Sequence, residues 1–178
     1  MRILFLDSPA FAKQDMIDAF EACNITCDLF FHKDYQERQS ADFEKCFLNA
    51  FQKKDYDLVF SFNYAPVLSR CCQKVNIKYV SYVYDSPLVA LYSCTLINPC
   101  NYVFIFDKAT YLTFHNAGIS TVHYLPLAAN VKRLTSMVAY SSAAQIGYIY
   151  MGLGMGTQAA LAAAFFHIFS HALTKPML

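Results

Sequence analysis

Three side chains near the end of the chain have the types and the spacing that could carry protons. His167, His171 and Lys175 are the only charged or imidazole side chains after Met137, and steps of four residues place them on one face of a helix. Ionisable groups inside a membrane are costly and usually line an ion path. The same spacing also fits the polar face of a short amphipathic helix, so both interpretations stay open.

A second set of polar side chains follows apolar runs in the first two thirds of the chain. The tripeptide Asp-Ser-Pro occurs twice, at 7–9 and at 85–87. A carboxylate or hydroxyl beside such a turn could hydrogen-bond a sugar hydroxyl or orient a proton acceptor. Asp and Ser also favour turns and helix N-caps for local reasons, which is the structural alternative at each position. The candidate substrate-binding residues are Ser8, Asn63, Asp85, Ser86 and Asp107, and the catalytic residues remain unknown.

The elements that must position these groups alternate along the chain. Short apolar runs rich in β-branched and aromatic residues predict strands. Segments with helical spacing lie between them, and the last of these closes on Gly118 as a C-cap. Together they predict an α/β fold with a Rossmann-like doubly wound parallel sheet, in which ligands bind at the carboxyl ends of the strands. The predicted strands are 2–7, 25–31, 56–62, 77–85, 101–107 and 120–125.

Composition divides the chain near Met137. Residues 1–137 carry 13 Lys and Arg against 13 Asp and Glu, all seven cysteines and one glycine. Residues 138–178 carry one charged side chain, no cysteine and four glycines. A domain at 1–137 is therefore predicted, followed by a hydrophobic two-helix segment at 138–178 that resembles a transmembrane hairpin.

Several function classes are not expected from the residues. No GxGxxG or Walker-type loop follows the first strand, so no cofactor is predicted. The seven cysteines form no CxxC pair, so no metal site is predicted either. A net charge of +1 argues against a nucleic-acid partner. The start of the chain lacks the pattern of a secretory signal, which favours a cytoplasmic location for 1–137.

Residues 1–137 resemble the N-terminal domain of bacterial CgeB-like (spore-maturation-protein-like) glycosyltransferases. The motifs that carry this likeness are RILFLDSPAF, DLFFHKDYQERQS, YDLVFSFNYAPVLS, NIKYVSYVYDSPLVALYS, INPCNYVFIFDK and TVHYLPLAANVKRL. The resemblance implies half of a GT-B fold, the acceptor-side domain of an enzyme that uses a nucleotide sugar and a glycosyl acceptor. Because the donor-binding domain is expected after LPLAANVKRL and does not follow, the resemblance implies an incomplete enzyme.

Residues 138–178 are similar to another family. AYSSAAQIGYIYMGLG and AAAFFHIFSHALTKPML resemble two consecutive transmembrane helices of the antiporter-like proton-translocating subunits of respiratory complex I, membrane-bound hydrogenases and cation/proton antiporters. The resemblance implies membrane association and makes His167, His171 and Lys175 proton-relay residues. Two helices are expected, Val138–Leu153 and Thr157–Lys175, with the turn at GLGMG because glycines disfavour a helix.

The two resemblances together predict a chimera. The first functional hypothesis is an acceptor-side glycosyltransferase domain that is catalytically incomplete. The alternative is a fragment of a membrane proton- or cation-translocating subunit that carries a cytosolic α/β domain. A third hypothesis is a small-ligand-binding α/β module whose hydrophobic tail docks on its own sheet.

Overall fold

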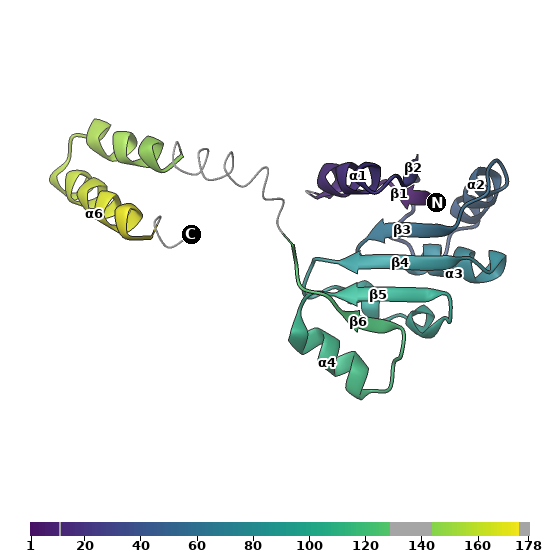
Figure 1. Cartoon of the computed structure of the whole chain (residues 1–178). Coiled ribbons are helices and arrows are strands. Elements are labelled where there is room, and N and C mark those ends of the chain that lie inside the picture. The colour runs from purple at the N-terminus through teal and green to yellow at the C-terminus, as the bar shows by residue number, and fades with distance from the viewer. Residues whose placement is uncertain (11, 129–143, 175–178) are drawn as a thin grey trace. The chain divides into compact units, whose positions relative to one another are not determined.

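A computed structural model of the chain describes residues 1–10, 12–128 and 144–174, with side chains up to residue 170 (Figure 1). The backbone separates into two units, Met1–Leu127 and Ala128–Leu178. The predicted boundary at residues 137 and 138 falls outside the described residues and stays a prediction.

The first unit is built on a six-stranded sheet in which every neighbouring pair is parallel. The order β2-β1-β3-β4-β5-β6 places the first strand inside the sheet, so the chain winds outwards in both directions from β1. The α/β parallel-sheet prediction is therefore confirmed, and each predicted strand is present. The strands are β1 (Arg2–Leu6), β2 (Thr26–Phe30), β3 (Leu58–Phe62), β4 (Lys78–Val83), β5 (Asn101–Ile105) and β6 (Val122–Tyr124).

Helices connect the strands at the four places where helical spacing occurs in the sequence. The link between β4 and β5 differs, because it consists of two 3₁₀ helices, η1 (Val89–Tyr92) and η2 (Cys94–Ile97). The α-helices of this unit are α1 (Lys13–Ala22), α2 (Ala41–Phe51), α3 (Pro66–Val75) and α4 (Lys108–Asn116).

Apolar side chains pack on both faces of the sheet. The larger core lies under α2, α3, η2 and α4, where the fully buried Phe43 and Phe47 of α2 stand one helical turn apart. The smaller core lies under α1, where Phe20 packs edge-on against Phe5 and Phe60. Burying each such side chain stabilises the fold by about 1.5–3 kcal/mol, so the two faces hold the strand ends in place.

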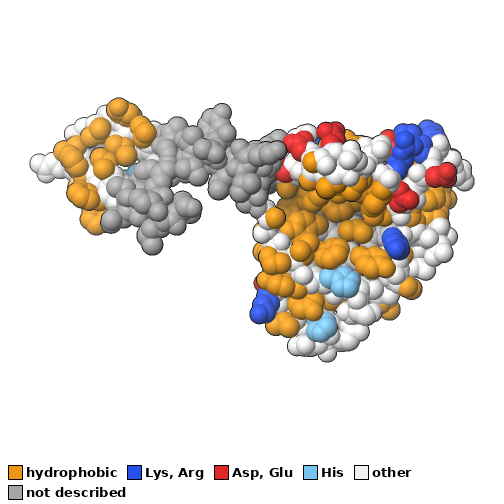
Figure 2. All heavy atoms as spheres, in the orientation of Figure 1, with side chains coloured by type: hydrophobic (Ala, Val, Ile, Leu, Met, Phe, Trp, Pro, Cys, Tyr) orange, Lys and Arg blue, Asp and Glu red, His pale blue; other side chains and the backbone are white. Residues whose placement is uncertain are grey.

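Part of the sheet's second face is only partly covered. Tyr102 of β5 is 38% exposed, and its ring stacks on His123 of β6. Figure 2 shows hydrophobic side chains gathered on the visible side of this unit. The phenol of Tyr82 in β4 donates to the carbonyl of Pro126, so the chain beyond β6 passes back over the end of β4.

Three asparagines adopt the left-handed conformation that glycine usually supplies. Asn24 follows α1, Asn63 follows β3 and Asn76 caps α3, with φ between 54° and 57°. Gly118, after α4, has φ of 82°, although the C-cap of α4 is Ala117, one residue before the predicted C-cap. Asparagine tolerates this conformation because its short polar side chain can bond locally.

The second unit contains two helical segments, 144–154 and α6 (Gln158–Thr174). They are separated at Met155–Thr157, where Gly156 has φ of 64°. The turn thus falls at the end of the predicted GLGMG stretch, whereas Gly152 and Gly154 lie inside the first helical segment. A Cβ built on Gly152 would lie 3.1 Å from the Cβ of Ala164, so small residues bring the two segments together. Within the described parts of the chain, no helix combines the length and the apolar character needed to cross a bilayer.

Candidate functional site

A cavity lies at the carboxyl ends of the strands, where the parallel sheet predicts a ligand site. Its volume is about 430 Å³. Of the five candidate residues, Ser8, Asn63 and Asp85 line it, from the ends of β1, β3 and β4. Ser8 is 8% exposed, whereas Asp85 is exposed. The sheet therefore brings together three side chains that lie far apart in the sequence.

Asn63 organises the polar side of this cavity. Its left-handed backbone turns the chain out of β3, and its amide nitrogen donates to Asp85 Oδ2 at 2.6 Å. Its amide oxygen accepts from the backbone N–H groups of Tyr84 and Asp85, at 3.2 and 3.3 Å. The side chain therefore joins the ends of β3 and β4 and aims one carboxylate at the cavity.

Ser86 and Asp107 do not line the cavity. Asp107 is the N-cap of α4, accepting from the backbone N–H groups of Ala109 and Thr110 at 3.3 and 3.0 Å. The hydroxyl and the amide of Thr110 lower the pKa of this carboxyl, because they donate to its charged form. Ser86 Oγ lies 3.4 Å from Asp107 Oδ2. The local alternative thus explains Asp107, and Ser86 lies beside it.

Aromatic side chains complete the cavity and were not among the candidates. Tyr35 and Gln36 come from the loop after β2, and Tyr64 and Tyr84 follow β3 and β4. Burial, and then the charge of Asp85, raise the pKa of Tyr84, so its phenol stays protonated and donates to the carbonyl of Pro9. Aromatic faces beside an amide and a carboxylate suit a ligand with hydroxyl groups and apolar edges.

The loop residues Tyr35 and Gln36 could not be found from the strand ends alone. They belong to the charged segment 30–46, which reads as a solvated loop and helix start. An aromatic and an amide side chain next to each other are common in binding sites, which is the one indication that the sequence offers. The spacing of residues in this segment does not predict that Tyr35 and Gln36 line the cavity.

The histidine group of the second unit is described in part. His167 of α6 is half-buried, and its Nε2 makes a hydrogen bond to Gln145 Oε1 of the first helical segment. The ring of Tyr148 stands edge-on to the imidazole with centroids 6.2 Å apart. His171 follows one turn later in the α6 backbone, whereas its side chain and Lys175 lie outside the described residues.

Comparison with known protein families gives one match that covers half of the chain. Residues 88–178 match the model of the family described as NADH:quinone oxidoreductase/Mrp antiporter, TM. The matched stretch begins at the N-cap of η1, well before residue 138, and includes β5, α4, β6 and His167. It therefore contains the stretch with the antiporter-like resemblance and extends into the sheet.

A curated relative gives the same family name. The NADH-quinone oxidoreductase subunit N of Desulforudis audaxviator (strain MP104C) is 49% identical over 49 residues, which make up 28% of this chain. These residues are 10% of the relative, so the chain spans about a tenth of the length of the curated protein it matches. No solved structure matches the chain. The resemblance of residues 1–137 to glycosyltransferases stays a prediction.

Proposed function

The chain belongs to the NADH:quinone oxidoreductase/Mrp antiporter family, and from this premise we propose that it is a membrane-associated component that works beside other subunits of a proton- or cation-translocating complex. Residues 138–178 are the membrane-facing segment in this proposal. The family match across 88–178 is the observation that carries it.

The contact between His167 and Gln145 supports a role in proton transfer. An imidazole can take up and release a proton near neutral pH, and the amide oxygen of Gln145 fixes the direction of one ring nitrogen. We place His167 and His171 one turn apart on a relay, with Lys175 one turn further. The relay is completed by charged groups of neighbouring subunits, because Asp and Glu are absent after Asp107.

Membrane fractionation tests the association. The full chain and a version that ends at Leu127 should be expressed side by side, and membranes should be washed with alkaline carbonate. We expect the full chain in the washed membrane pellet and the shortened chain in the supernatant. Recovery of the full chain in the supernatant would overturn the proposal.

Proton entry into vesicles tests the relay. Vesicles with an internal pH dye and the full chain should acidify faster after an external pH drop than vesicles with His167→Phe. His115→Gln, which changes an exposed histidine of α4 in the first unit, is the matched control and should acidify like the parent. Equal rates for His167→Phe and the parent would exclude this histidine from a proton path.

The cavity at the strand ends favours a second candidate function. A sugar-binding, acceptor-side glycosyltransferase domain fits the carboxylate of Asp85, the amide of Asn63 and the aromatic walls.

Saturation-transfer NMR with simple sugars tests this candidate. The sugar signals should be weaker with Asp85→Asn and unchanged with the exposed control Asp55→Asn. A transfer assay with common nucleotide sugars should show no turnover, because residues 1–137 resemble only the acceptor-side domain of such an enzyme. Absence of sugar binding would remove this candidate, and measurable transfer would contradict its incompleteness.

A further inference from the structure

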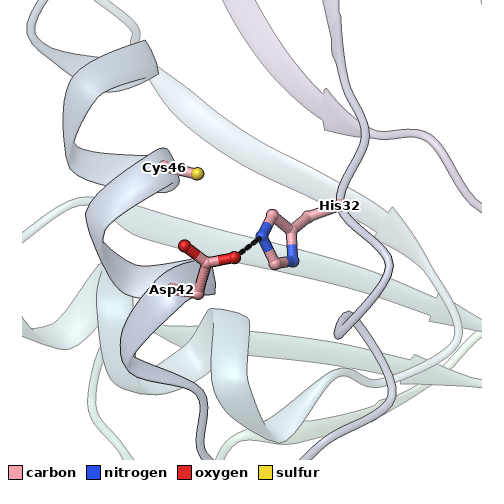
Figure 3. Close-up of side chains that lie close together, drawn as sticks. All are labelled: His32, Asp42 and Cys46. Atoms are coloured by element: carbon pink, nitrogen blue, oxygen red, sulfur yellow. Dashed lines mark hydrogen bonds and ion pairs between the residues drawn. The ribbon is translucent and has the colours of Figure 1, made fainter.

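Three side chains of different chemistry converge between the loop after β2 and helix α2. A ring nitrogen of His32, a carboxylate oxygen of Asp42 and the sulfur of Cys46 all lie within 4.8 Å of one another (Figure 3). His32 is 9% exposed, Cys46 is half-buried and Asp42 is open to solvent. The group therefore has a buried side and an accessible side.

Local structure places the three side chains. Asp42 and Cys46 are four residues apart in α2, so they share one face of the helix. The ring of His32 packs edge-on against Phe43, with centroids 5.3 Å apart, which turns the imidazole towards α2. Ser40 caps α2 by accepting from Phe43 N–H, and so fixes where the helix begins.

We propose that His32, Asp42 and Cys46 form a binding site for a divalent transition-metal ion of the zinc type. Nitrogen, sulfur and one carboxylate oxygen form a donor set that zinc accepts, whereas magnesium and calcium prefer oxygen ligands alone. The exposed side of Asp42 leaves the fourth position of a tetrahedral ion to water.

The distances already approach those of such a site. His32 Nε2 and Asp42 Oδ2 are 3.3 Å apart. Two ligand atoms on a tetrahedral zinc ion, each about 2.1 Å from the metal, are separated by about 3.4 Å. The sulfur of Cys46 lies within 4.8 Å of both atoms, and a single side-chain torsion sets its position.

Charge also favours the ion. Binding converts the Cys46 thiol to a thiolate and releases its proton to solvent. With the Asp42 carboxylate, two negative charges then balance the divalent cation. The positive end of the α2 dipole would repel a bare cation. It has little effect on the bound ion, because the thiolate and the carboxylate make the site neutral as a whole.

The histidine has to change its tautomer when the ion binds. Asp34 N–H donates to His32 Nδ1 at 3.2 Å, so the ring carries its proton on Nε2, which faces Asp42. The ion takes the place of this proton, which moves to Nδ1, and the Asp34 N–H hydrogen bond is given up. The net release is one proton for each ion, and it comes from Cys46.

Titration of the full chain with Co²⁺ under reducing, anaerobic conditions tests the site. We expect one ion per chain, with the visible bands of tetrahedral cobalt and a sulfur-to-cobalt charge-transfer band, both removed by one equivalent of Zn²⁺. Cys46→Ser should abolish the charge-transfer band. His32→Gln and Asp42→Asn should each weaken Co²⁺ binding by more than about 100-fold. This loss exceeds that expected for a residue that only hydrogen-bonds to a metal ligand.

The controls separate this site from other thiols and from unfolding. Cys23→Ser, at an exposed cysteine of α1's C-cap, should leave all bands unchanged. Asp42→Asn is the variant expected to keep its fold, because its side chain is exposed, and circular dichroism should verify this. The proposal is overturned if the parent shows no tetrahedral cobalt spectrum, or if the charge-transfer band survives in Cys46→Ser.

Discussion

The buried hydroxyl of Tyr79 links the end of strand β3 to the start of helix α3. It is fully buried in β4, and its phenol makes a hydrogen bond to Ser61 Oγ at 2.6 Å and accepts from Ala65 N–H at 3.0 Å. Burial raises its pKa, so the phenol remains neutral. One hydroxyl therefore joins β3, β4 and the N-cap of α3.

Tyr79→Phe should lower the free energy of unfolding by about 1–3 kcal/mol, because the buried Ala65 N–H loses its acceptor. Urea unfolding followed by circular dichroism measures this loss. Tyr92→Phe is the control, because Tyr92 is 67% exposed, and its effect should stay within about 0.5 kcal/mol. Equal stability of the two variants would show that the Tyr79 hydrogen bonds contribute little.

Buried thiols predict a loss of stability in alkaline solution. Burial raises the pKa of Cys27 and of Cys71 from 9.0 to about 11. A raised folded-state pKa stabilises the protein below the unfolded pKa, and this contribution is lost as the pH rises from 9.0 towards 11. Urea unfolding at about pH 8 and about pH 10.5 should therefore show lower stability at the higher pH.

The variant Cys71→Ala isolates one thiol from the tyrosines that also titrate in this range. Its stability should fall less between the two pH values than that of the parent. Cys23→Ala, at an exposed cysteine, should leave the difference as it is in the parent. A Cys71→Ala protein with the parent's full pH dependence would contradict the assignment.

At the scale of the elements, the start of α2 determines where two functional groups lie. Ser40 accepts from Phe43 N–H at 3.1 Å and donates to Asp34 Oδ2 at 2.7 Å, so it joins the loop after β2 to the helix. This loop carries Tyr35 of the cavity and His32 of the proposed metal site. The positions of Tyr35 and His32 therefore both depend on the Ser40 cap.

Ser40→Ala should lower the free energy of unfolding by about 0.5–2 kcal/mol, the usual cost of losing an N-cap. Thermal or urea unfolding measures it. Thr113→Ala is the control, because its hydroxyl donates to the Ala109 carbonyl inside the same helix α4, and alanine favours a helix. A loss no larger than that of the control would show that the Ser40 side chain does not stabilise α2.

The sequence predicted the elements well because their signals are local. Short apolar runs predict all six strands, and Gly156, the last glycine of GLGMG, lies in the turn between the described helical segments 144–154 and α6. The link between β4 and β5 escaped prediction because 3₁₀ helices of four residues have no periodic pattern. The general rule that parallel strand ends meet also brought Ser8, Asn63 and Asp85 to one cavity.

Groups that depend on loop paths could not be predicted. The prediction of no metal site considers cysteine pairs and stays a prediction. The site proposed above instead depends on the path of the loop after β2 and on Phe43, which packs against the ring of His32. Asp107 follows a strand end, which suggests a ligand, and its oxygens accept hydrogen bonds from the first N–H groups of α4. From the sequence alone, a carboxylate that is available to a ligand looks the same as one that caps a helix. The structure separates the two cases because it shows where the first N–H groups of the helix lie.

For the whole molecule, the sheet unit holds nearly all of the core. Among the described residues, every buried hydrophobic side chain except Ala164 belongs to Met1–Leu127. A chain that ends at Leu127 should therefore unfold in urea with the same free energy as the sheet unit of the full chain, within about 1 kcal/mol. Circular dichroism measures both, and a larger difference would mean that residues 128–178 stabilise the sheet unit.

The three left-handed asparagines affect the unfolded chain as well as the folded one. At Asn24, Asn63 and Asn76 a glycine would fit the backbone without strain, but it would leave the denatured chain with many more conformations. Asparagine accepts a modest local strain in the native turn and limits the disorder that folding must remove. Only one of the chain's five glycines, Gly118, lies before residue 138, so in the sheet unit asparagine takes over most of the left-handed positions that glycine would otherwise fill.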